Sequence, residues 1–496
     1  MPTPELTVRR LSIDLRPDPR RVLLRPFIPS LIVKPSAAPE LGNRVLKIYH
    51  RVMELDEERV AEEFERLMRE FDDRHLDLNE EFLQRFESIA PALPMEPMPS
   101  EKRQLLLGAY FTNEYSLESA ALFNPSIVPH PDQEGVKEGC LRFVMSLRAT
   151  GEGHISSVVF RSGILCADGE VELDPVSRHV VEPHPQPAAQ YERETFRRKL
   201  LELGVSERCC TEVTGRVDET FVLADLHQAI AEIQKDQCGE ALRQACLKAK
   251  VLAEANYTVR FRSTTGMSER VLFPFSPSES NGIEDARFVK FEDDAQGPMY
   301  YATYTAYNGT VALPQMVETR DFLTFRFSTL NGGAVKNKGL AMFPRKIGGR
   351  FVMLGRQDSE NIHLMSSDDP HFWHESEVLV EPREPWEFVQ LGNCGSPIET
   401  EAGWLVLTHG VGAMRKYSIG AVLLDLEDPS KVIGRLRNPL LGPNEDEREG
   451  YVPNVVYSCG GLVHGGRLIL PYAVSDSASR FAVVELAELI DAMKEH

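Results

Sequence analysis

Repeated strand pairs are the feature of this sequence that most constrains its fold. Five segments share one design, in which an apolar strand led by Gly or a polar residue is followed by a polar group and a second apolar strand. They are residues 142–148 with 155–160, 299–304 with 310–313, 350–356 with 362–365, 403–409 with 419–424, and 466–472 with 481–485. They recur roughly every 40 to 65 residues once a helical insertion is set aside. Because such units cannot bury their faces alone, the repeat predicts a mainly β chain that forms a five-bladed β-propeller.

Two other stretches have the spacing of amphipathic helices. Between residues 44 and 91, apolar side chains such as Val60 and Phe64 recur every three to five positions among Glu and Arg, and a second block covers roughly 190–255. The charged faces of such helices are ordinarily solvated, so we assign them no chemistry. We divide the chain into a Pro- and Arg-rich lead with a helical extension at 1–100 and a propeller domain at 101–496, interrupted by a helical insertion at about 185–255.

Composition excludes several classes of partner. The 496 residues carry a formal net charge of -20, which repels polyanions, and no basic patch offsets it, so we expect no nucleic-acid partner. No run is apolar enough to span a membrane and the N-terminus has no apolar signal core, so we expect no membrane partner and a cytoplasmic protein. The eight cysteines include no Cys-x-x-Cys pair, and we expect buried free thiols rather than disulfides or a metal site.

The stretch from Asn281 to Val289 holds the first candidate site. After a Gly-led turn, Glu284 and Asp285 stand side by side and Arg287 follows, at the mouth of a strand. A carboxylic acid beside a guanidinium can transfer a proton to a bound ligand. An ordinary salt-bridged turn has the same composition, and this stretch alone does not decide between them.

The repeat predicts which other polar residues gather near Asp285. In a propeller, equivalent positions on successive blades face the same axial opening, so the residues that close each first strand should converge. Those residues are Arg148, Tyr304 or its neighbour Tyr307, Arg356, His409 and Tyr472, with Asp476 just beyond. They predict a polar, partly cationic site at one end of the channel.

Several longer motifs carry a resemblance to a known family. They are Gly-Ile-Glu-Asp-Ala-Arg at 282–287 and the segments 337–356, 396–400 with 403–411, 424–429 and 450–456. In this order they resemble glycoside hydrolase family 130, over about 120–165 and 255–490. The resemblance implies a five-bladed propeller, in agreement with the repeats, and a β-mannoside phosphorylase or β-mannosidase that inverts the anomeric configuration.

The resemblance also implies roles for individual residues. Asp285 stands in the place of the family's general acid, which in the phosphorylases relays its proton through a sugar hydroxyl. Lys338, Arg356, His409 and Tyr417 resemble the phosphate pocket. The residues expected to bind the sugar are Asn124, Arg148, Glu284, Arg287, Tyr304 and Asp476. Inorganic phosphate is then the co-substrate and α-mannose 1-phosphate the product, with no cofactor and no metal.

Two positions depart from the phosphorylase pattern and keep alternatives open. Lys338 stands where Arg is common, and Glu399 stands where the phosphorylases carry Lys. A carboxylate repels phosphate but can activate water as a general base, so Glu399 keeps an inverting β-mannosidase, a hydrolase, as the alternative. A non-catalytic carbohydrate-binding propeller is the alternative from another class. The N-terminal helices are expected either to cover the site or to join copies in a homo-oligomer, and the sequence does not choose between these roles.

Overall fold

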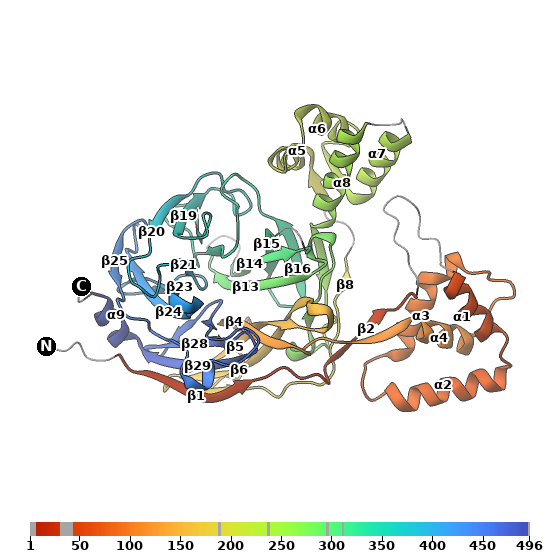
Figure 1. The fold of residues 1–496 in the computed structure, drawn as a ribbon, viewed down its shortest axis with the longest axis horizontal. Helices are drawn as coiled ribbons and strands as arrows, with labels where there is room; N and C mark the ends of the chain where they lie inside the picture. Colours follow the sequence, from red (N-terminus) through yellow and green to blue (C-terminus); the bar gives the residue numbers. More distant parts are fainter. Residues whose placement is uncertain are drawn as a thin grey trace. The chain divides into compact units, whose positions relative to one another are not determined.

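Antiparallel strands make up most of the larger of two units in this chain (Figure 1). The structure, a computed structural model, describes residues 6–29, 43–186, 190–235, 239–293, 297–309 and 312–494. The larger unit comprises Met1–Pro17, Ala120–Val176 and Glu182–His496, and the smaller comprises Asp18–Ser119 and Ser177–Val181.

The described residues of the larger unit hold five groups of strands. The first is β4 (Ala121–Pro129), β5 (Cys140–Thr150), β6 (Ser156–Cys166) and β7 (Val171–Leu173), and the second is β13 (Gly282–Phe291), β14 (Met299–Tyr307), β15 (Ala312–Thr319) and β16 (Thr324–Thr329). The third is β17 (Ala341–Met342), β18 (Phe351–Gly355), β19 (Ile362–Ser367) and β20 (Glu377–Val380). The fourth is β21 (Gln390–Asn393), β22 (Ile398–Thr400), β23 (Gly403–Val411), β24 (Tyr417–Leu424) and β25 (Val432–Arg435). The fifth is β26 (Val456–Tyr457), β27 (Leu462–His464), β28 (Arg467–Val474), β29 (Ala478–Glu485) and β1 (Val8–Leu15).

The strand pairs expected from the sequence are confirmed as hairpins. β5 pairs with β6, β14 with β15, β18 with β19, β23 with β24, and β28 with β29. Thr310 and Val311, at the start of one expected strand, lie outside the described residues. The short strands β8 (His184–Pro185), β11 (Tyr257–Arg260) and β12 (Val271–Leu272) extend the first two groups, which a bridge between Gly282 and Ser156 joins into one sheet.

Alternate residues of a strand pack against different neighbouring groups. In β23, Leu405 and Leu407 belong to an apolar cluster that contains Leu468 and Leu470 of the fifth group. Trp404 and Val406, which point the other way because side chains alternate along a strand, belong to a cluster with Val352 and Leu354 of the third group. The strand is therefore buried on both faces and reads as an almost continuous apolar run.

Each group contacts the next one in chain order. β13 contacts β6, β14 contacts β17, β18 contacts β21, β24 contacts β26, and β28 and β29 contact β4, so the fifth group lies beside the first. The N-terminal strand β1 pairs with β29. The first and last parts of the larger unit are therefore hydrogen-bonded to each other.

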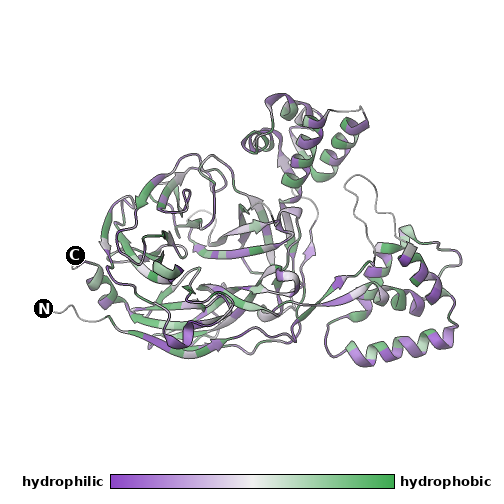
Figure 2. Ribbon diagram, in the orientation of Figure 1, coloured by the Kyte–Doolittle hydropathy of each residue, from purple (hydrophilic) through white to green (hydrophobic). Residues whose placement is uncertain are grey.

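Helices occupy the two stretches where the apolar spacing predicts them, and the described residues hold two further α-helices, at 101–110 and 486–494, that the spacing did not predict. The smaller unit contains α1 (Asn43–Met53), α2 (Glu57–Phe71), α3 (Leu78–Ile89) and α4 (Glu101–Tyr110), with β2 (Val22–Pro26) paired to β3 (Thr112–Ser116). Figure 2 shows α2 with mostly hydrophilic residues and a hydrophobic stripe, and its Val60 and Phe64 are buried. The insertion contains α5 (Arg193–Glu202), α6 (Glu207–Thr214), α7 (Leu223–Lys235) and α8 (Glu240–Glu254), with β9 (Gln190–Glu192) paired to β10 (Thr220–Val222), and α9 (Leu486–Lys494) follows β29. Among the helices that the structure describes, none combines the length and apolarity needed to cross a membrane.

The expectation that the cysteines are free thiols is wrong for one pair. Cys140 and Cys166 form a disulfide. They lie directly opposite each other in β5 and β6, with Cα atoms 4.0 Å apart, and this register is not visible in their spacing along the chain. The other cysteines that the structure describes are buried thiols: Cys209, Cys210, Cys246, Cys394 and Cys459.

A charged histidine stabilises the loop between β19 and β20. His371 Nε2 lies 2.6 Å from Glu318 Oε1, and His371 Nδ1 lies 3.4 Å from Asp369 Oδ1. Burial alone would lower the pKa of His371, but the hydrogen bonds to Asp369 and Glu318 outweigh it and raise the pKa to about 9. A base with a raised pKa stabilises the folded state below its unfolded pKa of about 6.5, and this contribution disappears as the pH rises through the folded pKa.

We therefore expect the stability difference between the wild type and His371→Gln to depend on pH. The wild type should be more stable by roughly 3 kcal/mol at pH 6, and the pH-dependent part of this difference should be lost by about pH 10. Denaturant unfolding of both proteins at several pH values between 6 and 10 measures it. A difference that stays constant over this range would show that His371 is not charged in the folded protein.

Candidate active site

Asp285 lies at a bulge near the start of β13. The pairing of β13 with β14 shifts register between Glu284 and Arg287. Asp285 has a φ of 54°, in the left-handed region that residues other than Gly rarely occupy. A bulge redirects a side chain away from the alternation of its strand, and strained backbone of this kind is frequent at functional sites. The bulge thus sets the directions of both carboxylates, Glu284 and Asp285.

Asn124 lies at a second bulge, in the neighbouring strand group. The pairing of β4 with β5 shifts between Phe123 and Ser126, and Asn124 has a φ of 50°. Its Nδ2 donates a hydrogen bond of 2.6 Å to Asp285 Oδ1. Two irregular strands therefore direct their side chains toward each other.

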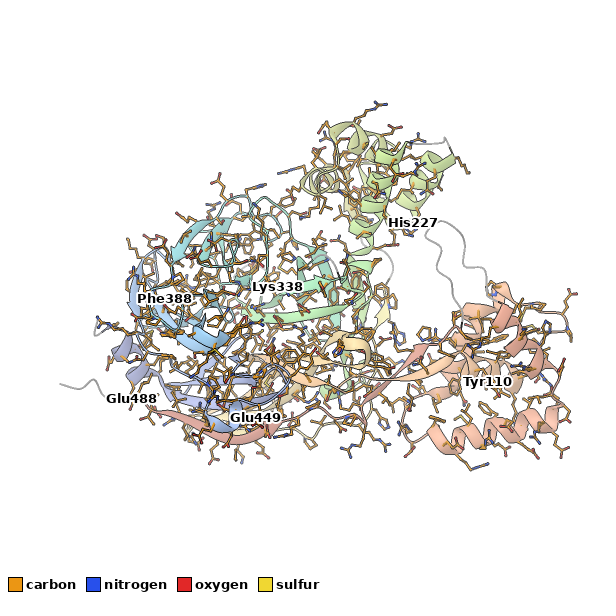
Figure 3. All side chains as sticks on the ribbon, viewed as in Figure 1. Tyr110, His227, Lys338, Phe388, Glu449 and Glu488 are labelled. Atoms are coloured by element: carbon orange, nitrogen blue, oxygen red, sulfur yellow. A yellow bond between two sulfur atoms is a disulfide. The ribbon has the colours of Figure 1, made fainter. Side chains whose placement is uncertain are left out.

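Arg148 joins both carboxylates of β13. Its Nη1 lies 3.2 Å from Asp285 Oδ1 and its Nη2 lies 2.7 Å from Glu284 Oε1, while its Nε donates to Ser156 Oγ at 2.9 Å. The second oxygen of Glu284 accepts a hydrogen bond of 2.8 Å from Lys338 Nζ. Figure 3 labels Lys338 among the side chains beside β13. Glu284 is therefore held between two cations.

Arg287 lies behind these residues and is 2% exposed. Its Nη1 donates to the backbone oxygen of Asp285 and its Nε to that of Cys394, both at 2.9 Å. Its Nη2 donates to Tyr457 Oη at 2.8 Å. None of these bonds joins a carboxylate. Arg287 therefore keeps an unneutralised positive charge, which lowers the pKa of the nearby Asp285.

The two aspartates of the site differ in their pKa values. Burial works to raise the pKa of Asp285, but the positive charges of Arg148 and Arg287, the Asn124 hydrogen bond and the charge of Lys338 outweigh it and lower the pKa to about 2. Burial, together with the negative charge of Asp285, raises the pKa of Asp476 to about 6. Groups whose surroundings push their pKa values apart are typical of acid and base chemistry.

Arg356 and His409 form a second part of the site. Arg356 Nη1 lies 2.9 Å from His409 Nε2. Burial and the charges of Arg356 and Arg287 lower the pKa of His409 well below its usual value, so its ring is neutral and can accept this hydrogen bond. Gly392 pairs with His409 in the β21–β23 ladder, and a Cβ at Gly392 would lie 2.5 Å from His409 Cε1 and 3.1 Å from Arg356 Cδ. The absence of a side chain at Gly392 makes room for both residues.

Lys338 and Tyr417 lie next to this pair. Asn337 Nδ2 donates to the backbone oxygen of Arg356 at 3.0 Å, which fixes the loop that carries Lys338. The ring of Tyr417, at the start of β24, stacks on that of His409 with centroids 6.2 Å apart. The structure therefore brings the residues of the expected phosphate pocket together, near the carboxylates of β13.

Three expected site residues do not join this cluster. Tyr304 is 2% exposed, and its hydroxyl donates to Glu279 Oε1 at 2.6 Å. Glu399 binds Arg345 at 2.7 Å, with its side chain 43% exposed. It pairs with Trp404, five residues before His409 in β23, which corresponds to about 17 Å along a strand at ~3.4 Å per residue. Tyr472 likewise points away, with its hydroxyl bound to Glu447 at 2.6 Å.

Tyr457 is a site residue that sequence reasoning missed. Besides accepting from Arg287, its ring lies edge-on to His409 with centroids 4.8 Å apart. It directly follows the motif at 450–456, and this position was the only signal that could have identified it. In the described part of the chain, no group of three or more His, Cys, Asp or Glu side chains is arranged to hold a metal ion.

The close packing at Gly392 leads to a prediction. In Gly392→Ala the added methyl group should displace His409 and Arg356, and we expect kcat/KM for the reaction proposed below to fall at least about tenfold through a higher KM for phosphate. Steady-state kinetics with varied phosphate measures it. Gly239→Ala is the matched control, because a Cβ there meets nothing within 4 Å. Equal activity of the two variants would contradict the packing argument.

Comparison with known proteins agrees with the motifs. A family model described as β-1,4-mannooligosaccharide phosphorylase, of glycoside hydrolase family 130, matches residues 253–495. A 1,2-β-oligomannan phosphorylase of Thermoanaerobacter sp. (strain X514) is 34% identical over 219 residues, which cover 42% of this chain and 71% of that protein. A β-1,2-mannobiose phosphorylase of Listeria innocua serovar 6a is 32% identical over 227 residues, 44% of this chain and 62% of that protein. A solved structure of the β-1,2-mannobiose phosphorylase from Listeria innocua, in complex with β-1,2-mannobiose, aligns with a TM-score of 0.45 and 22% identity over 76% of this chain and 93% of that one.

Proposed function

Because this chain belongs to glycoside hydrolase family 130, we propose that it is an inverting β-mannoside phosphorylase, a glycoside phosphorylase that cleaves β-mannosidic linkages with inorganic phosphate and releases α-mannose 1-phosphate. The observation that carries the proposal is the position of Lys338, Arg356 and His409 beside the carboxylates of β13, while Glu399 is bound by Arg345 elsewhere. A group of cations can bind an anionic nucleophile such as phosphate, whereas water would need a general base beside it to become nucleophilic.

Asp285 is the proposed general acid. An inverting reaction needs an acid that protonates the leaving oxygen and a nucleophile on the opposite face of the sugar ring. Without ligands, the pKa of about 2 keeps Asp285 ionised. A bound phosphate adds negative charge beside the cations that lower this pKa, so its binding favours the protonated acid. The proton then reaches the leaving oxygen through a sugar hydroxyl.

Lys338, Arg356, His409 and Tyr417 are the proposed phosphate ligands. Arg356 supplies a planar guanidinium that can donate two parallel hydrogen bonds to phosphate oxygens. Lys338 supplies an ammonium group that acts as a point charge. A neutral His409 still carries one ring N–H. It can donate this hydrogen to phosphate in the tautomer that places the proton on the nitrogen facing the anion. Phosphate needs no general base, because the anion is already nucleophilic.

Asn124, Arg148, Glu284 and Asp476 are the proposed sugar ligands. Glu284 and Asp476 can accept hydrogen bonds from sugar hydroxyls, and Asn124 and Arg148 can donate them. Arg287 is better explained as a positioning residue, since its bonds run to backbone oxygens and to Tyr457. Tyr304 has no part in the proposal, because its hydroxyl is bound to the buried Glu279.

We also propose that the five strand groups are the blades of a five-bladed β-propeller. The contacts of each group with the next, and of the fifth with the first, support it. In this proposal a helical extension within residues 1–100 precedes the propeller domain expected at 101–496, and a helical insertion at about 185–255 interrupts it. The boundary at residue 100 needs correction, because β1 pairs with β29 of the fifth group and the smaller unit runs to Ser119. Inorganic phosphate is the co-substrate, no metal or other cofactor takes part, and the enzyme works in the cytoplasm.

Product analysis tests the proposed reaction. Purified protein is incubated with short β-mannosides of defined linkage, with and without inorganic phosphate, and mannose 1-phosphate and free mannose are measured. We expect phosphate-dependent formation of α-mannose 1-phosphate. Free mannose at a rate independent of phosphate would indicate the mannosidase, and neither product with any linkage would favour the carbohydrate-binding propeller.

Substitution of Asp285 tests its role as the acid. Asp285→Asn cannot supply the proton, and we expect kcat to fall roughly 10²- to 10⁴-fold, the usual contribution of general acid catalysis. Glu399→Gln is the control and should stay within about twofold of the wild type, because the side chain of Glu399 is bound to Arg345. A large loss of activity in Glu399→Gln alone would overturn the assignment.

A further inference from the structure

The segment from Gly450 to Tyr457 runs along the site and is fixed to it at several points. A Cβ at Gly450 would lie 2.5 Å from Ser475 Cβ, so the backbone packs directly on the turn that carries Asp476. Val452 N donates to the backbone oxygen of Ser475 at 3.0 Å. The backbone of Tyr451, between these two contacts, is therefore held beside Ser475, the residue before Asp476. Figure 3 labels Glu449, the residue before this segment.

The same segment also contacts Tyr417, a proposed phosphate ligand, and the positioning residue Arg287. Tyr417 N donates to the backbone oxygen of Asn454 at 3.1 Å. Tyr457, at the end of the segment, accepts from Arg287. The backbone on both sides of Tyr451 is therefore tied to the site, yet the side chain of Tyr451 is 59% exposed.

His154 holds the exposed ring of Tyr451 from another strand group. Tyr451 Oη lies 3.4 Å from His154 Nδ1, and the two rings have centroids 5.9 Å apart with an interplanar angle of 34°. His154 lies in the turn between β5 and β6 with a φ of 60°, and Arg148 lies in β5 two residues before that strand ends. The contact between His154 and Tyr451 thus connects the turn that follows β5, the strand of Arg148, with the segment 450–457.

Exposure decides which part of a substrate can reach Tyr451. The side chains of Arg148 and Asp285 are only 18% and 15% exposed, so the mannosyl unit that is attacked has to lie deep in the site. The next sugar along the chain lies toward solvent, where the ring of Tyr451 is. Sugars present apolar C–H faces and hydroxyls, and an aromatic ring with a polar tip complements both.

We propose that Tyr451, held by His154, is the platform for the leaving-group sugar, a neutral pyranose, and so contributes to acceptor specificity. This inference rests on the proposed phosphorylase function. The ring supplies the contact area, and His154 limits its rotation, so less conformational entropy is lost when the sugar binds.

In the reverse reaction, which joins the two sugars, the binding of each sugar can be measured separately. The enzyme is given α-mannose 1-phosphate and an acceptor mannoside, and the KM of each is measured. In Tyr451→Ala we expect the KM for the acceptor to rise about tenfold while the KM for mannose 1-phosphate changes by less than about twofold. Tyr451→Phe keeps the ring and should retain most of the affinity for the acceptor. His154→Ala should raise the acceptor KM about threefold.

Controls distinguish a binding role from a structural one. Val378→Ala removes exposed apolar surface from β20, where the side chain is 47% exposed, and should leave both KM values unchanged. An unchanged acceptor KM in Tyr451→Ala, or an equal rise of both KM values, would overturn the platform. A wild type without phosphate-dependent activity would instead overturn the proposed function itself.

Discussion

The ion pairs of Arg148 with Glu284 and Asp285 are the interaction on which the site depends. They connect the first strand group to the second and place both carboxylates within 3.2 Å of the Arg148 guanidinium. Removing one partner from a buried pair of this kind costs about 3 to 5 kcal/mol, because the other charge stays buried. Lys338 and Arg287 add positive charge around the same carboxylates, and together these cations lower the pKa of Asp285 to about 2.

The strand groups make this concentration of charge possible. Their apolar clusters, such as the one around Leu405 and Leu468, fix the spacing between groups, and the bulges at Asn124 and Asp285 release single side chains from the strand pattern. Gly392 leaves space for Arg356 and His409 to approach each other. The chemistry therefore comes from local exceptions to regular sheet geometry within a rigid surrounding.

Local pattern predicts the regular part of this structure and part of the site. Repeated apolar runs identified β23 and β28, and the position of Arg148, Arg356 and His409 at or near strand ends predicted that they converge. Contacts between distant residues were not predictable. Cys140 faces Cys166 because of the register of β5 and β6, which the sequence spacing does not reveal. Tyr304 likewise donates its hydroxyl hydrogen to Glu279, a residue that the strand pattern does not connect with it. Motif position placed Glu399 with the site, but Arg345, a residue of the motif at 337–356 to which the sequence assigned no role, binds its carboxylate elsewhere.

In the proposed reaction, the cations beside Asp285 bind the phosphate that attacks the sugar. Calorimetric titration of the ligand-free protein with inorganic phosphate tests it most directly. We expect one phosphate site per chain, at least about tenfold weaker in Arg356→Met and unchanged in Glu399→Gln. Phosphate binding that is equally tight in Arg356→Met, or that is lost in Glu399→Gln, would contradict it.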